Sequence, residues 1–304
     1  MPFKGINNLR DHNESVPMER WQLEELRKCA NDPMYFIINY VYINTKDKGM
    51  QLFKMWDFQK ELVQKYIAFR YVIAKWPRQS GKSMSTMAYL LWYSLFHKSK
   101  VVVILANKLS LAQEQLQHFR DAYIALPYWM QPGVSTWAKR EVRLSHGTRI
   151  KCSATSPDTV RGMAINVLYL DEYSFVKAHI AEEFIASVFP TISSGKTTKV
   201  IISSTPSGMN HFYKMWQDAK GDYSVTSEGN GYVKSEISWN AIPGRDEKWA
   251  REEQARIGEI RFNQEYKCIN YNETITIRNK TNNLIEKISI GDFYERLIKE
   301  QNNM

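Results

Sequence analysis

The sequence predicts an α/β fold in which a mostly parallel sheet carries helices on both faces. From about residue 51, short apolar segments alternate with amphipathic helical segments, as expected for strands joined by crossover helices. A Gly-Lys-Ser loop stands between the first such strand and its helix, and a later apolar strand ends in two adjacent carboxylates. The chain is long enough for such a fold, because 304 residues with 43% hydrophobic content can bury a sizeable core.

Composition limits the classes of function. The formal net charge of +9 favours an anionic partner, and nucleic acid is the commonest such partner, although many basic proteins bind none. Three cysteines lie far apart without a C-x-x-C pair, so neither a zinc site nor a disulfide framework is indicated. The N-terminus lacks the apolar core of a signal peptide, and no run approaches the roughly 20 apolar residues that span a bilayer. We expect a soluble intracellular protein without a membrane partner.

Four parts of the chain are expected in order. Residues 1–50 form an N-terminal helical segment, with a helix over 18–30 that Pro33 interrupts. Residues 51–220 form the core, 221–267 a small subdomain or linker, and 268–304 a short β-rich tail. The core strands are expected at 71–75, 100–106, 148–154, 166–172 and 198–205, and the helices at 82–97, 110–126 and 179–189. Glycine and asparagine residues mark 227–236 as a loop.

Residues 74–83, AKWPRQSGKS, contain most of a phosphate-binding loop. Gly81, Lys82 and Ser83 match the end of the pattern G-x-x-x-x-G-K-S/T, and Trp76 stands where its first glycine belongs. The loop follows a predicted strand and opens a predicted helix, where backbone N–H groups and the helix N-terminus face a phosphate. Lys82 is expected to reach the β- and γ-phosphates of ATP, and Ser83 to hold Mg²⁺. Alone, the tripeptide Gly-Lys-Ser would more often be a chance match.

The segment NVLYLDEYSF supplies the second motif. Its apolar residues place Asp171 and Glu172 at the end of a buried strand, which is the Walker B arrangement. Asp171 is expected to bind Mg²⁺, usually through water, and Glu172 to polarise the attacking water. The alternative is a strand that ends in a solvated acidic turn. The phosphate-binding loop upstream favours the Walker B interpretation over this alternative. The two motifs together predict a P-loop NTPase of the ASCE type.

Three further features are candidates for the same site. The strand KVIISST ends in Ser203, Ser204 and Thr205, hydroxyls suited to sensing the γ-phosphate or its water, although such a strand end alone is usually a turn. Arg78 has a fixed fork of donors suited to stabilising the transferring phosphoryl group in cis; a solvated arginine is the alternative.

Upstream, Phe58 and Gln59 offer a ring and an amide suited to stacking on and hydrogen-bonding adenine. Without further information, a Phe and a Gln on a helix would more often be a core residue and a surface residue.

In this order and spacing, the motifs resemble the large terminase subunit of tailed phages, especially of the T4-like type. The resemblance runs from about residue 28 to 267 and rests on NDPMYFIINYVYI, WDFQKELV, PRQSGKS, LPYWMQPGV, SPDTVRG, LYLDEYSF and STPSGMNHFY. A Walker A loop that lacks its first glycine and carries Arg-Gln before x-Gly-Lys is typical of that family. The resemblance implies an ATPase motor that drives double-stranded DNA into a prohead through the portal protein. It also implies an oligomeric ring on the portal, a small terminase subunit as partner, and action in the cytoplasm of the infected host cell.

The resemblance implies roles for particular residues. It places Gln59 at adenine, assigns Asp171 and Glu172 to metal and catalysis, and assigns Ser203 to Thr205 to coupling. It marks Arg161, in the segment VRG, as a second phosphate or coupling residue. Phosphate and Mg²⁺ binding falls to the loop residues Arg78, Gln79, Ser80, Gly81, Lys82 and Ser83. In that family a ribonuclease H-like nuclease domain follows, and because only 37 residues come after Lys267 we expect no nuclease in this chain.

The segment that begins CINYNETITIR resembles the N-terminal block of inteins. Strands are expected at 274–278 and 284–290, with a turn at 279–283 and a helix start at 291–299. In that family the first Cys attacks the preceding carbonyl in an N-to-S acyl shift, which here would be Cys268 attacking Lys267. The later intein blocks are missing, so a split intein is implied, whose partner fragment brings the rest of the intein and the nuclease domain by trans-splicing. The alternative is a divergent, truncated linker with an inert Cys268.

Two other classes of function stay open. One is a helicase on a similar ATPase core, which needs further motifs that we do not find. The other is a non-hydrolysing DNA-binding or scaffold remnant of a terminase, which would show no turnover although Lys82 and Glu172 are present.

Overall fold

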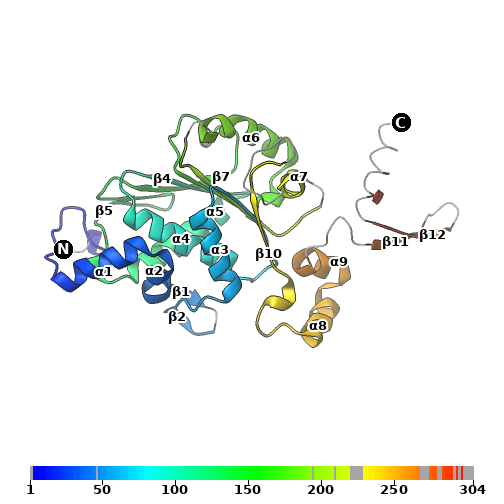
Figure 1. The fold of residues 1–304 in the computed structure, drawn as a ribbon, viewed down its shortest axis with the longest axis horizontal. Helices are drawn as coiled ribbons and strands as arrows, with labels where there is room; N and C mark the ends of the chain where they lie inside the picture. The colour runs from blue at the N-terminus through cyan, green and yellow to red at the C-terminus, as the bar shows by residue number, and fades with distance from the viewer. Residues whose placement is uncertain are drawn as a thin grey trace.

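A computed structural model (Figure 1) shows a central eight-stranded sheet in the order β10-β3-β9-β8-β4-β7-β6-β5. The structure describes residues 3–45, 47–193, 195–208, 210–219, 229–267, 274–278, 283–289, 292–293 and 296. Neighbours from β10 to β7 are parallel, and β6 and β5 continue the sheet in antiparallel pairing. The strands are β3 (Tyr71–Lys75), β4 (Val101–Ala106), β5 (Val134–Trp137), β6 (Glu141–Leu144), β7 (Arg149–Ala154), β8 (Val167–Asp171), β9 (Lys199–Ser204) and β10 (Val233–Glu236).

The order of the strands confirms the predicted class. β9 lies between β3, which leads into the phosphate-binding loop, and β8, which ends in the two carboxylates. This extra strand between the two motif strands is the arrangement of ASCE-type P-loop NTPases. Because the strands are parallel, their carboxyl ends share one edge of the sheet, and the motifs converge there.

Helices cover both faces of the sheet, as predicted. One face packs on α3, α4 and α5, with α1 and α2 beyond them, and the other packs on α6 and α7 (Figure 1). Alternate residues of β4 enter the two cores, which explains why its sequence is continuously apolar. The helices are α1 (Arg20–Asn31), α2 (Pro33–Tyr40), α3 (Asp57–Ala68), α4 (Lys82–Phe96), α5 (Leu109–Ile124), α6 (Ala178–Ser193), α7 (His211–Asp218), α8 (Glu247–Ile257) and α9 (Glu259–Phe262).

Pro33 separates the first two helices, as expected. α1 ends at Asn31, and Pro33 takes the first position of α2, where its missing N–H is not needed. The side chain of Asp32 caps α2 by accepting hydrogen bonds from the backbone N–H groups of Met34 and Tyr35. Within the described part of the chain, no helix is long and apolar enough to cross a bilayer.

One loop prediction was wrong. Residues 227–236 were expected to be a loop, yet Val233–Glu236 forms β10, which pairs in parallel with β3. An edge strand has only one neighbour and needs few apolar residues; here only Val233 and Ser235 are buried. Two antiparallel hairpins were also missed: β5 with β6, and β1 (Tyr42–Thr45) with β2 (Gly49–Leu52).

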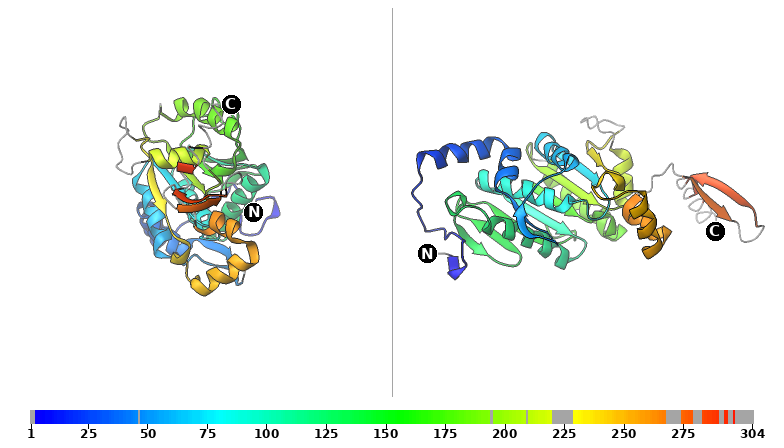
Figure 2. Two further views of the ribbon diagram at one scale, coloured as in Figure 1. Left: turned by 90° about the vertical axis from the view of Figure 1, so that its right-hand side faces the viewer. Right: turned by 90° about the horizontal axis from the view of Figure 1, so that it is seen from below.

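The tail contains the predicted strand pair. β11 (Thr274–Arg278) and β12 (Ile285–Ser289) form an antiparallel hairpin. In Figure 2 this hairpin lies beyond α8 and α9, at the opposite end of the molecule from α1. The expected turn and helix start fall largely outside the described residues.

Candidate active site

The phosphate-binding loop connects β3 to α4, and its shape depends on Gly81. Gly81 has a left-handed backbone with φ of 76°, and a Cβ atom there would lie 2.2 Å from Nε2 of Gln59. The amide of Gln59 donates to the backbone oxygen of Ser80 at 2.9 Å, so α3 supports the loop directly. The Ser80 hydroxyl donates to the oxygen of Pro77 at 2.8 Å and closes the loop from within.

Trp76 explains how the loop forms without its first glycine. The residue has no left-handed backbone, so nothing in the local conformation requires glycine. Its ring is fully buried, and the indole Nε1–H donates to Oγ of Ser235 on β10 at 3.1 Å. Trp76 therefore anchors the start of the loop to the edge strand.

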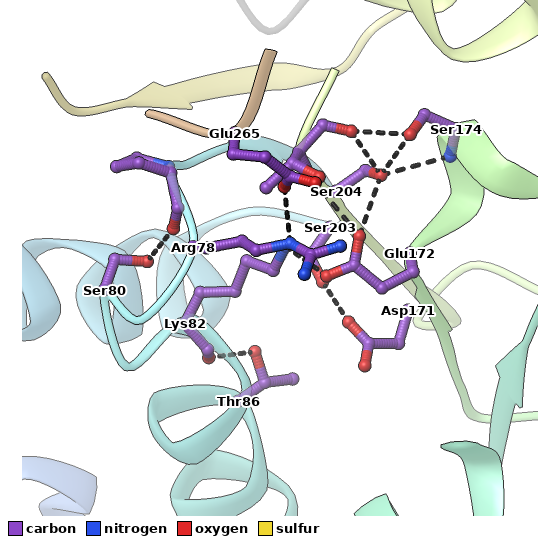
Figure 3. A network of polar contacts seen from close by, with 12 residues as sticks. Arg78, Ser80, Lys82, Thr86, Asp171, Glu172, Ser174, Ser203, Ser204 and Glu265 are labelled. Atoms are coloured by element: carbon purple, nitrogen blue, oxygen red, sulfur yellow. Dashed lines mark hydrogen bonds and ion pairs between the residues drawn. The ribbon is translucent and has the colours of Figure 1, made fainter. Parts of the chain in front are cut away.

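The two carboxylates leave the end of β8 and point toward the loop (Figure 3). Nζ of Lys82, a buried residue at the start of α4, donates to Oε1 of Glu172 at 2.9 Å. Glu172 has a left-handed backbone with φ of 49°, an uncommon conformation that turns its side chain away from the strand direction. Lys82 and Glu172 thus form an ion pair, and a γ-phosphate bound between them would separate the two side chains.

Asp171 is held by hydroxyl groups from two strands. Oδ1 of Asp171 accepts hydrogen bonds from Tyr169 at 2.8 Å and from Ser203 at 2.9 Å. Burial raises the pKa of Asp171, as does the charge of Glu172, while the charge of Lys82 and the two hydroxyl donors oppose that rise. A divalent cation would relieve this cost by favouring the ionised carboxylate.

The hydroxyl residues at the end of β9 divide between the two carboxylates. Ser203 contacts Asp171, whereas Oγ of Ser204 donates to Oε2 of Glu172 at 3.3 Å and the backbone N–H of Thr205 does so at 3.4 Å. Ser174, in the turn after β8, shares a hydrogen bond of 2.7 Å with Ser204 (Figure 3). A movement of Glu172 would therefore change the hydrogen bonds of β9 and of the turn after β8.

Arg78 belongs to the loop but is engaged elsewhere. Its guanidinium forms an ion pair with Glu265, and its backbone N–H donates to the oxygen of Glu265 at 3.0 Å. Arg245 donates to the backbone oxygen of Arg78 at 3.0 Å. The side chain of Arg78 is 56% exposed even though it is ion-paired. Contact with a phosphate would require Arg78 to leave Glu265.

A cavity of about 550 Å³ joins these parts, which is within the usual size range of ligand sites. Its wall includes the loop from Pro77 to Met84, with Gln79, Lys82 and Ser83 among its residues, and Glu172. The residue after β4 and one side of α5 also line it, with Asn107, Leu111, Glu114, Gln115 and His118. The structure thus brings together the residues predicted to bind phosphate and Glu172.

A second cavity, of about 260 Å³, lies on the other side of Gly81. The β1–β2 hairpin, Trp56 and Gln59 line it, whereas Phe58 packs its ring on Trp56 and Trp76. Both ends of the Gln59 amide are occupied, because Oε1 accepts from the backbone N–H of Trp56 at 2.9 Å. The adenine roles of Phe58 and Gln59 stay predictions, and in this conformation Gln59 supports the loop.

Arg161 does not join the others. It lies in the loop between β7 and β8, 69% exposed, and pairs with Asp158 at 3.2 Å. It is not among the residues that line the phosphate cavity. Its assigned role stays a prediction.

Ser83 at the cavity and the neighbouring buried Asp171 carry oxygen atoms that fit Mg²⁺. Asp171 and Ser83 offer the hard oxygen atoms that this ion prefers, and the described residues contain no cluster of three or more His, Cys, Asp or Glu that would cage a metal alone. Such a site is completed by phosphate oxygens and water, as is usual for nucleotide-bound Mg²⁺.

The predicted splicing residue, Cys268, lies outside the described residues. The two described cysteines are buried and free, and burial raises the pKa of Cys29 to about 12 and that of Cys152 to about 11. Neither is an activated nucleophile.

Comparison with known proteins identifies the family. Residues 73–280 match the family described as terminase large subunit, T4likevirus-type, N-terminal. The terminase large subunit of Thermus phage G20c is 30% identical over 124 residues, covering 38% of this chain and 24% of that protein. The chain therefore matches about a quarter of the length of this relative.

Solved terminase structures share the fold. The large terminase ATPase domain of Thermus phage P74-26 superposes with a TM-score of 0.59 at 19% identity, covering 71% of this chain and 95% of that domain. The large terminase of a thermophilic bacteriophage, solved in complex with ATP-gamma-S, gives 0.52 at 9% identity, covering 82% of this chain and 74% of that one. Since the family match covers more than half of the chain, and the fold and motifs agree with it, this chain belongs to the T4-like phage terminase large subunits and contains their N-terminal ATPase domain.

Proposed function

We propose that this chain is the ATP-hydrolysing motor of a viral DNA-packaging terminase, which uses ATP and Mg²⁺ to move double-stranded DNA into a prohead. The observation that carries the proposal is the pairing of Lys82 with Glu172 across the phosphate cavity at 2.9 Å. Lys82 is buried and Glu172 is partly exposed, so a phosphate that enters the cavity would replace the carboxylate as the partner of Lys82. The large terminase of the thermophilic bacteriophage was solved with ATP-gamma-S, which supports ATP as the ligand.

ATP binding would separate this pair. Lys82 would turn to the β- and γ-phosphates, with the N-terminus of α4 facing the same charges. Glu172 would then be free to accept a proton from water as the water oxygen attacks the γ-phosphorus. The bond from phosphorus to the bridging oxygen breaks, and ADP leaves with that oxygen. Ser83 and Asp171 would hold Mg²⁺, which would neutralise charge at the phosphates.

Arg78 would stabilise the charge that develops on the transferred group, once it leaves Glu265. The guanidinium fork is suited to equatorial phosphoryl oxygens. The contacts of Ser204 and Thr205 with Glu172 support their proposed role in coupling, because the rearranged carboxylate would change their hydrogen bonds. Adenine would occupy the cavity of about 260 Å³ beside Gly81, where Trp56 offers an exposed ring.

The partners follow from family membership and stay proposals. They are double-stranded DNA, the portal protein of the prohead and the small terminase subunit, with several copies of this chain forming a ring on the portal. The site of action would be the cytoplasm of the infected host cell.

Phosphate release from ATP by the purified chain tests the function. We expect Mg²⁺-dependent turnover that Lys82→Ala and Glu172→Gln both abolish. Absence of turnover by the folded parent chain would refute the ATPase, and absence of nucleotide binding as well would favour the scaffold remnant. Unwinding of a DNA duplex would favour the helicase instead.

We propose that residues 268–304 are the N-terminal fragment of a split intein. The hairpin of β11 and β12 supports this proposal, because both strands occupy the expected places. The family match continues to residue 280, so the boundary at Cys268 is part of the proposal. In the first step, Sγ of Cys268 attacks the carbonyl carbon of Lys267, the peptide C–N bond breaks, and the released nitrogen takes a proton.

Mass spectrometry of the chain mixed with its candidate partner fragment tests splicing. We expect a ligated product and an excised fragment, both lost in Cys268→Ala. If neither product forms with the parent chain, the split intein is refuted.

A further inference from the structure

Asn107 is a half-buried polar residue that the mechanism above does not use. It follows Ala106, the last residue of β4, and Ala106 pairs with Asp171 across the parallel strands. The residue after each of these is therefore next to the other at the carboxyl edge of the sheet, which puts Asn107 beside Glu172. Both residues line the phosphate cavity.

The amide oxygen of Asn107 lacks a partner. Oδ1 is shielded from solvent, and no described residue donates a hydrogen bond to it. A buried acceptor without a donor is costly, and such atoms in native proteins call for an explanation such as a bound water or ligand. Gln115, which is 7% exposed on the same wall of the cavity, also has a buried oxygen without a described partner. Two of the buried oxygens without a described partner thus belong to residues that line the cavity.

A structural role for Asn107 is not evident in the described contacts. An asparagine just before a helix commonly caps its first N–H groups. Here the N-cap of α5 is Lys108, and no side-chain cap bond is formed. By contrast, Asn166 at the opposite edge of the same two strands uses its Oδ1 to accept the backbone N–H of Val101 at 2.9 Å. Asn166 thus makes a structural hydrogen bond, whereas Asn107 lines the cavity and its oxygen has no described partner.

We propose that Asn107 is a catalytic residue that orients the attacking water for hydrolysis. An attacking water must direct its oxygen lone pair at the γ-phosphorus, so both of its hydrogens must be held elsewhere. Glu172 would take one hydrogen as a proton, and the other hydrogen would stay on the oxygen and be donated in a hydrogen bond to Oδ1 of Asn107. Because Oδ1 is shielded from solvent in this conformation, the amide would have to turn toward the cavity when the water binds. The two residues directly follow paired positions of neighbouring strands, and both line the cavity that would hold this water. The inference rests on the proposed ATPase function.

The role predicts opposite effects for the two asparagines. Asn107→Leu removes the acceptor, so kcat for ATP should fall about a hundredfold, with KM changing less than about threefold. The melting temperature without nucleotide should stay the same or rise, because an unsatisfied buried acceptor is removed. Asn166→Leu should lower the melting temperature and leave kcat within about threefold, because it breaks a structural hydrogen bond far from the cavity.

The experiment measures kcat, KM and melting temperature for the full chain, for Asn107→Leu and Asn107→Ala, and for Asn166→Leu and Glu172→Gln. Wild-type kcat in either Asn107 variant would overturn the proposal, as would a loss of kcat that only follows a loss of stability. If Glu172→Gln abolishes turnover and the Asn107 variants retain it, only Asn107 was misassigned. If Glu172→Gln keeps turnover, or the parent chain has none, the proposed function fails and this inference falls with it.

Discussion

Replacing Gly81 with alanine tests how the phosphate-binding loop is held. The new Cβ would lie 2.2 Å from Nε2 of Gln59, and the backbone would keep its φ of 76°. A left-handed alanine costs about 1–2 kcal/mol. Displacing Gln59 breaks its 2.9 Å bond to the oxygen of Ser80, and leaving that buried acceptor unpaired costs about 1–3 kcal/mol. We expect Gly81→Ala to lower the free energy of unfolding by about 2–5 kcal/mol.

Two control variants separate these contributions. Gly244→Ala has a similar backbone, with φ of 84°, and open space around the new Cβ, so it should cost only the backbone part of about 1–2 kcal/mol. In a Gln59→Ala background, Gly81→Ala should also cost only that part, because the obstacle is gone. Urea unfolding of the four variants measures this. Equal costs for Gly81→Ala and Gly244→Ala, or a cost at Gly81 that does not depend on Gln59, would refute the account of the loop.

Three further predictions concern charge. Burial raises the folded-state pKa of Asp171, so the folded chain binds more protons than the unfolded chain between the ordinary Asp pKa and the raised value. The free energy of unfolding should therefore fall as pH rises through that window. Unfolding in Mg²⁺-free buffer should show this fall, and Asp171→Asn should remove it. Glu265→Gln frees Arg78 for phosphate and should lower KM for ATP about two- to fivefold, with no such effect in an Arg78→Ala background; an unchanged KM would contradict it. Arg143, Arg149 and Lys151 lie on one face of β6 and β7. If each contacts a DNA phosphate, replacing all three with alanine should reduce the slope of the logarithm of the DNA-binding constant against the logarithm of salt concentration by up to about 3. An unchanged slope would show that this face does not bind DNA.

Most of the sheet could be predicted from the sequence, because a strand buried on both faces is a continuous apolar run. All five core strands that were expected are present. β10 was missed since an edge strand such as Val233–Glu236 needs few apolar residues, and its pairing with β3 is a long-range contact. The hairpins of β1 with β2 and β5 with β6 have no strong turn signal of the Asn-Gly kind.

The site was predictable where chemistry follows local spacing. Gly81, Lys82, Asp171 and Glu172 stand in motifs whose strands share one edge. Tyr169 could have been found as well, because residues two apart on a strand share a face, so its hydroxyl lies beside Asp171.

Other contacts had no local signal. Glu265 and Arg245 contact Arg78 although they lie more than 160 residues further along the chain, and only folding brings them together. Gln59 lies at the loop, but as its support, because the same amide caps α3 and binds Ser80. The orphaned oxygen of Asn107 also depends on tertiary structure, since an asparagine before a helix ordinarily predicts a cap.

The most direct test of the central claim is to measure nucleotide binding and turnover together in Glu172→Gln. In the proposed mechanism, Lys82 binds the phosphates and Glu172 accepts a proton from the attacking water. The variant should therefore bind Mg²⁺-ATP at least as tightly as the parent chain, because Lys82 loses its charged partner, and hydrolyse it at least about a hundredfold more slowly. Turnover within a few fold of the parent, or loss of binding in a folded Glu172→Gln variant, would contradict the account.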